Sequence, residues 1–345
     1  MTNMIDQCGH RSTLRTAGYF PRARRRSLSL LAVLFVASTG CATAFNKTGA
    51  ALGDAMTELP RALVPEGSLA SRLCEQRSRF DFLHHRVEGS RAYAWDTPPR
   101  WTEWWSTHLR DKARPDLGTW ADHCGRIDQV SKSQAASARL LAAYGRALRA
   151  LVDEGQYEGE DLKSIAASTA NIVESLGGDN FLAKNKSAIA NAGDPMKQIM
   201  NLLLAAYTRS QLSDAITRSA PAIDLILAAI QSYVEAVESE RTDALSRLEA
   251  VLNAAEPSFV GADRTADAAQ AFVFHEFAVR WTEDLRAPAA RQKAYLAALQ
   301  ELRDSHKSLA AEANRALPSE HGLSQIRTRA AAAGAALTSL GSLNN

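Results

Sequence analysis

Two groupings of histidine and carboxylate have the residue types for metal binding or proton transfer. His275 stands beside Glu276 in an aromatic-rich stretch, where imidazole and carboxylate could share a metal ion or a proton. A zinc-protease motif needs a second histidine four residues after the first, and Val279 occupies that position. Asp81 and His84 have the spacing used by di-metal helical bundles, but the pattern occurs once instead of twice. We therefore expect structural roles for these residues, with no metal site, no cofactor and no catalytic residue.

A cluster of tryptophans is the sequence feature that most suggests recognition. Five of the six tryptophans fall between residues 95 and 120. Four aromatic residues of this region have the spacing of one continuous stripe on a helix: Trp101, Trp104, Trp105 and His108. Tryptophan is common in binding hot spots and stacks on sugars, so an exposed stripe would bind glycan strands or a partner protein. The alternative is that the stripe forms the core of a small helical subdomain.

The N-terminal residues have the composition of an export signal. Six arginines and one aspartate lie in the first 26 residues, and an apolar run over residues 28–37 leads into small residues up to position 40. A run of about ten apolar residues is too short to span a bilayer, which needs about 20. This order of basic, apolar and small residues is typical of a secretory signal peptide. The consecutive arginines 24–26 leave twin-arginine export open as a route.

The residues that lead to Cys41 resemble the signals cleaved by the bacterial lipoprotein signal peptidase. Small residues precede the cysteine, and Ser38 stands where leucine is usual. The resemblance implies a signal peptide over residues 1–40 and a mature chain that begins at Cys41 with lipid on that cysteine. Because Ala42 follows instead of aspartate, it also implies the periplasmic face of the outer membrane. Ordinary signal cleavage, with Cys41 as a plain thiol, is the alternative.

Charge and cysteine content narrow the functional classes to which the mature chain could belong. Without residues 1–41 the chain has 34 basic and 37 acidic residues, a net charge of −3, which argues against nucleic-acid binding. Besides Cys41, two cysteines remain, Cys74 and Cys124. In an oxidising compartment such a pair indicates a disulfide, with two separate buried thiols as the alternative.

Helices must position these groups. Alanine is abundant and no run of β-branched or aromatic residues has a period of two, which predicts an all-α protein. Residues 41–67 hold small residues, glycines and prolines, and are predicted to be a lipidated tether. The first predicted helix begins at Ser68. Further helices are predicted over residues 130–154, 160–176, 196–207, 221–253 and 265–285. Two more helices are predicted from the apolar seams over residues 299–313 and 323–340.

The predicted helices divide into two regions. Residues 68–192 are expected to form a small N-terminal helical subdomain stapled by the disulfide, and residues 193–345 a bundle of long antiparallel, coiled-coil-like helices. The final helix has an unbroken alternation of three- and four-residue steps at Leu323, Ile326, Ala330, Ala333, Leu337 and Leu340. We expect it to pack as a hairpin on the preceding helix, with His306 as a hydrogen-bonded core residue.

One predicted helix raises the question of a membrane segment. Residues 223–237 are strongly apolar, yet their polar residues, including Asp224 and Glu235, fall on one narrow stripe. This pattern favours a central, mostly buried helix of a bundle.

As a whole, the mature chain is similar to the uncharacterised all-helical lipoproteins of Gram-negative bacteria. The resemblance implies a non-enzymatic scaffold or accessory subunit of an envelope complex, held to the membrane by its lipid and bound to a protein partner. Peptidoglycan binding through the tryptophan stripe is one alternative. A metal- or cofactor-dependent envelope enzyme is another, although the sequence has no phosphate-binding glycine loop and no nucleophile elbow.

Overall fold

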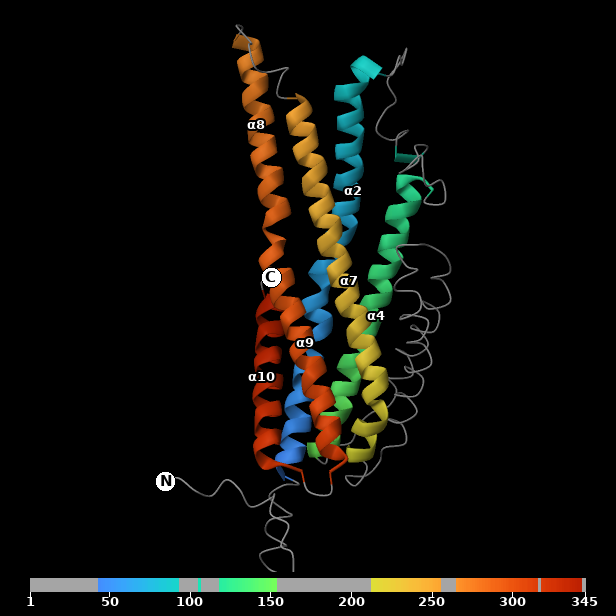
Figure 1. The fold of residues 1–345 in the computed structure, drawn as a ribbon, viewed down its shortest axis with the longest axis vertical. Coiled ribbons are helices and arrows are strands. Elements are labelled where there is room, and N and C mark those ends of the chain that lie inside the picture. The colour runs from blue at the N-terminus through green and yellow to red at the C-terminus, as the bar shows by residue number, and fades with distance from the viewer. Residues whose placement is uncertain are drawn as a thin grey trace, which may run out of the picture.

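The computed structural model describes residues 43–92, 105–106, 118–153, 212–255, 265–315 and 318–342. These residues form long helices packed side by side, with no strand among them, which confirms the predicted all-α bundle (Figure 1). The predicted signal peptide with Cys41, and the helices expected over residues 160–176 and 196–207, lie outside the described residues.

The helices extend along the long axis of the molecule. They are α2 (Leu59–Ala92), α4 (Trp120–Asp153), α7 (Leu212–Ala255), α8 (Thr265–Arg286), α9 (Pro288–Ala313) and α10 (Glu320–Ser342). A further helical segment over residues 43–57 precedes α2, from which a turn at Glu58 separates it. In Figure 1, α2 and α7 run in one direction along the whole bundle and α4 runs in the opposite direction. The described part of the chain is therefore an elongated antiparallel bundle.

The two halves of the bundle, divided along its long axis, contain different helices. Ala287 keeps helical dihedral angles, φ −53° and ψ −39°, and Pro288 takes the first position of α9, so α8 and α9 follow one another almost without a break. The helix α10 then turns back along α9, packs also against α2, and does not continue along the length of α8 (Figure 1). One half of the described bundle thus contains both α9 and α10, whereas the other half contains α8 without a second helix of this C-terminal group.

The hairpin of α9 and α10 agrees with the sequence prediction. All six residues of the predicted final seam are buried, from Leu323 to Leu340, and α10 packs on α9. His306 is 1% exposed, within the same core. The predicted boundary near residue 192 falls outside the described residues, and α2, α4, α7, α9 and α10 contribute to one continuous hydrophobic core.

The structure differs from the predicted tether at residues 43–67. Those residues are helical except for the turn at Glu58, and Leu52 and Met56 are fully buried. Pro60 lies in the first turn of α2, where a missing N–H breaks no helical hydrogen bond. Ser68, the expected helix start, lies inside α2 and donates to the Pro65 carbonyl at 2.9 Å.

The helix α4 begins ten residues before the predicted position. Thr119 and Asp122 form a reciprocal capping box, since the Thr119 N–H donates to the Asp122 carboxylate at 3.0 Å and the Asp122 N–H to the Thr119 hydroxyl at 3.2 Å. The hydrogen bond from the Thr119 backbone, followed by the one that the Thr119 hydroxyl donates to the same carboxylate at 2.8 Å, holds the pKa of Asp122 below its usual value. The cap places Trp120 and His123 in the first turn of a helix instead of a loop.

Small residues in this segment allow close helix packing, where a flexible tether was predicted. Gly53 in the first helical segment faces Gly145 in α4, and a Cβ on either glycine would overlap the carbonyl oxygen of the other. On another side, Gly334 of α10 approaches Ala55 so closely that an added Cβ would lie 3.1 Å from the alanine Cβ. The segment that looked like a tether therefore fits between α4 and α10 because its side chains are small.

Two glycines of α4 allow a matched test of this packing. Gly145→Ala should destabilise the protein by about 1–3 kcal/mol through overpacking, despite the better helix propensity of alanine. Gly125 has no atom within 4 Å of an added Cβ, so Gly125→Ala should stabilise the protein by up to about 1 kcal/mol. Urea unfolding of both variants measures the difference, and equal stabilisation by both would contradict the close approach.

Candidate functional site

The two cysteines predicted to pair do so, in the half of the bundle where α8 lies. Cys74 of α2 and Cys124 of α4 form a disulfide that closes a sequence separation of 50 residues. Cys74 is 0% and Cys124 9% exposed. A loop of this length stabilises a fold by about 4 kcal/mol in the chain-entropy model. Because thiol exchange needs access to a sulfur, the burial indicates a structural bond.

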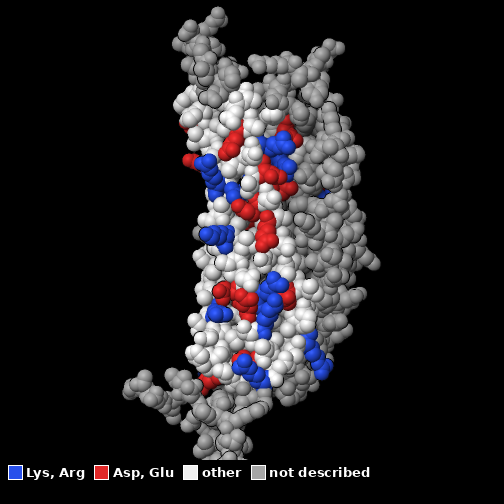
Figure 2. Space-filling model, in the orientation of Figure 1, with Lys and Arg blue, Asp and Glu red and all other residues white. Residues whose placement is uncertain are grey.

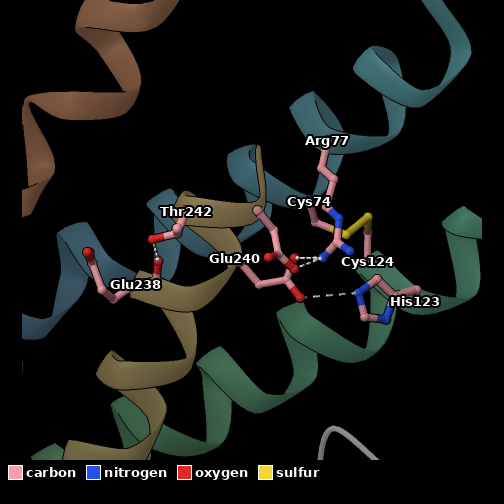
Figure 3. Close-up of polar contacts among 8 residues, drawn as sticks. Cys74, Arg77, His123, Cys124, Glu238, Glu240 and Thr242 are labelled. Atoms are coloured by element: carbon pink, nitrogen blue, oxygen red, sulfur yellow. Dashed lines mark hydrogen bonds and ion pairs between the residues drawn. A yellow bond between two sulfur atoms is a disulfide. The ribbon is translucent and has the colours of Figure 1, made fainter. Parts of the chain in front are cut away.

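Charged side chains surround this disulfide and join a third helix to it (Figure 3). Arg77 of α2 binds Glu240 of α7 at 2.7 Å and Asp243 at 3.1 Å. His123 approaches the same Glu240 carboxylate at 3.9 Å from α4. The Arg77 guanidinium also lies 5.9 Å from the ring centre of Trp120, within cation–π range. This charged junction holds α2, α4 and α7 together.

Aromatic rings continue from this junction to α8. Phe80 of α2 lies 4.6 Å from Trp281 of α8, and Trp281 lies 4.3 Å from Phe277, each between ring centres. Arg241 of α7 donates to the Leu285 carbonyl at 3.0 Å. These contacts attach the C-terminal part of α8 to α2 and α7.

A second polar junction lies in the core where α2 meets α9. Glu66 is 1% exposed, and it accepts hydrogen bonds from Arg291 and Gln292, both at 3.0 Å. Nearby, burial raises the pKa of Tyr295, with the Glu66 charge as a second cause. Burial likewise raises the pKa of Tyr233, which shares a 2.7 Å hydrogen bond with Ser131. The phenols therefore remain protonated and neutral beside a buried carboxylate.

A third junction includes the predicted core histidine. His306 Nε2 lies 2.9 Å from the Tyr144 hydroxyl, which lies 2.8 Å from the Ser219 hydroxyl, so the chain of hydrogen bonds joins α9, α4 and α7. Close by, Asp224 pairs with Arg303 and with Lys307 at 2.9 Å. The hydrogen bond from Arg303 is the main reason why the pKa of Asp224 lies below its usual value.

The histidine of this junction makes the stability depend on pH. Burial lowers the pKa of His306 from 6.5 to about 4. Between these two values the unfolded chain takes up a proton that the folded chain does not, so stability should fall by on the order of 3 kcal/mol as pH drops from 6.5 to 4. His306→Gln should lose this component, while the exposed His275→Gln should keep it. Chemical unfolding across this pH range tests the difference, and identical profiles for both variants would contradict it.

The two groupings of histidine and carboxylate lie on different helices, α8 and α2. His275 and Glu276 both lie on the exposed side of α8. Asp81 is 8% exposed and pairs with Arg247 of α7 at 3.2 Å. Within the described ranges, no group of three or more histidine, cysteine or acidic residues could hold a metal ion.

The predicted tryptophan stripe is described only in part. Trp105 is half-buried and packs against the hydrophobic core, whereas Trp101, Trp104 and His108 lie outside the described residues. Trp120, from the same cluster, is 1% exposed.

The sequence analysis missed an exposed apolar surface on α8. Phe272 and Val273 are 64% and 67% exposed, and Phe277 and Val279 are 36% and 41% exposed. Phe272 and Val279 lie on one flank of the helix, and Val273 and Phe277 lie on the other. Their aromatic and branched types are those of a core helix, so residue type alone does not indicate exposure. The signal that they are exposed is the charged ridge between them, which includes Glu276 and Arg280.

On the face shown in Figure 2, basic and acidic side chains lie beside one another along the bundle, without a large area of one sign. By length and composition one described helix, over Ile216–Ala254, could cross a membrane, but half of its most apolar stretch is buried.

No protein-family model matches the chain, and neither a curated protein nor a solved structure matches it.

Proposed function

We propose that this chain is a non-enzymatic lipoprotein, anchored through Cys41 to the periplasmic face of the outer membrane, that serves as a scaffold or accessory subunit of an envelope complex. The observation that carries the proposal is the form of the described helices, a long rigid bundle with an exposed apolar surface on α8. Three polar junctions use buried charges to hold helices together. The large exposed apolar side chains of α8, near one end of the bundle, are available for recognition.

The sequence around Cys41 supports the anchor, and the disulfide is consistent with an oxidising compartment. A single acyl chain binds membranes only marginally, whereas two or more bind stably. A lipoprotein of this class would therefore remain with the membrane when salt is raised.

Labelling with a palmitate analogue tests the anchor. Wild type should incorporate the label and fractionate with membranes. Cys41→Ala should not incorporate the label, and any processed form of it should not fractionate with membranes. The double variant Cys74→Ala, Cys124→Ala is the matched control, because it removes the other two cysteines of the proposed mature chain and should keep the label. If wild type takes up no label and Cys41→Ala is processed normally, the protein is an ordinary secreted one.

A photo-reactive residue at Phe272 tests the partner surface. Illumination should cross-link a specific envelope protein to a photo-reactive residue at position 272. A photo-reactive residue in place of the exposed Glu301 on α9 should give no such cross-link. Phe272→Asp should abolish co-purification of that same protein without changing the helical content, because a charge would have to be desolvated in the interface. Equal cross-linking from both positions, or unchanged co-purification with Phe272→Asp, would show that α8 is not the binding surface.

A further inference from the structure

We infer that the end of the bundle where Thr43 begins rests on the headgroups of the anchoring bilayer, so that the bundle stands upright without a flexible tether. The inference rests on the proposed lipidation of Cys41. It adds a lipid-contacting surface, an orientation and a fixed height to that proposal.

Covalent geometry sets the first limit. Thr43 is the second residue after Cys41 and the first described residue of a helix. Consecutive Cα atoms are 3.8 Å apart, so the Cα atoms of these two residues are at most about 7.6 Å apart in any conformation. The start of the bundle must therefore lie within about 10 Å of the residue that would bear the lipid.

Contacts in the first helical turns prevent that segment from moving as a separate tether. Phe45 is 8% exposed. Thr48, which is 1% exposed, donates to the Ala44 carbonyl of its own helix at 2.8 Å and lies 3.2 Å from the Leu323 carbonyl of α10. One turn further, Gly53 packs on Gly145, and Asp54 pairs with Arg149 of α4. The anchored residue is thus coupled to the bundle itself.

The same end of the bundle is suited to a headgroup surface. It includes the start of α10 and the end of α9, to which the start of α7 is tied by a 3.0 Å hydrogen bond from Ser213 to the Ala313 carbonyl (Figure 1). The large exposed apolar side chains of the described residues are Val64 in α2 and those of α8, none of them in these turns. Contact without insertion is therefore expected there.

Three basic side chains are exposed at this end, and a bilayer with anionic lipids attracts that sign. They are Lys47, Arg218 and Arg315, of which Arg315 pairs with the buried Glu312, and Glu320 is an exposed acid beside them. The face shown in Figure 2, by contrast, carries mixed charges, so electrostatic attraction does not favour laying that face on the bilayer.

An upright bundle places the apolar surface of α8 at a defined height. From Phe272 to Ala313 the run of α8 and α9 covers about 60 Å at 1.5 Å per residue. The partner-binding residues would therefore lie about 60 Å above the bilayer, and the absence of a tether would keep that height constant.

Energy transfer to a headgroup-labelled lipid measures this orientation. The full-length protein, extracted in mild detergent and reconstituted in vesicles of phosphatidylcholine and phosphatidylglycerol, would carry a fluorescent amino acid at His321, Glu301 or Val273. All three positions are exposed. Transfer should be strong at 321, intermediate at 301 and near zero at 273. A Gly/Ser insertion of about ten residues after Ala42, which adds a mean reach of about 17 Å, should reduce transfer at 321.

The outcomes separate the two proposals. Protein that fails to associate with the vesicles overturns the anchor and this inference together. Protein that associates but shows equal transfer from all three positions overturns the upright placement alone. Transfer at 321 that persists after the insertion shows that headgroup attraction alone holds this end at the bilayer, and overturns the claim that the short link to Cys41 sets the height.

Discussion

Two charged residues on the buried seam of α2 constrain the arrangement of the other helices. Glu66 is 1% exposed and the side chain of Arg77 is 11% exposed, so both are largely removed from water. An unpaired buried charge costs several kcal/mol, and removing one partner of a buried pair costs about 3–5 kcal/mol. Arg291 and Gln292 of α9 satisfy Glu66, whereas Glu240 and Asp243 of α7 satisfy Arg77. Sliding either helix by one turn would break its pair, so these two contacts set the axial register.

The register has consequences for function. With α9 fixed against α2, the almost unbroken run into α8 places α8 beside Phe80. The C-terminal part of α8 is held there by Trp281, while Phe272 and Val273, nearer its start, are exposed. The position of the surface that we propose for a partner thus follows from the positions at which the buried charges of α2 pair with α7 and α9.

Much of this fold follows from periodicity in the sequence. The final seam and the hairpin of α9 and α10 could be predicted because their core residues are apolar and evenly spaced. The seam of α2 also has alternating three- and four-residue steps, at Leu52, Met56, Leu59, Leu63, Glu66, Ala70, Leu73, Arg77 and Phe80. Its start was missed because glycines and prolines nearby indicated a tether, and because glycine that permits close packing looks the same in sequence as glycine that permits flexibility. The pairing of Glu66 with α9 could not be predicted, since periodicity identifies a buried position without identifying its partner. The same limit applies to α8, because aromatic residues are typical of a buried face, whereas none of the described helices covers both flanks of α8.

The position of the disulfide has a further consequence, for proteolysis. Cys74 and Cys124 bracket the whole connection between α2 and α4, and the bond between them is buried. A peptide bond cleaved anywhere between the two cysteines leaves two fragments that are still covalently joined. The fragment that contains Cys74 keeps its contacts with α7, which belongs to the other fragment together with Cys124, so a nicked chain can retain its shape and its surface after the backbone has lost its continuity.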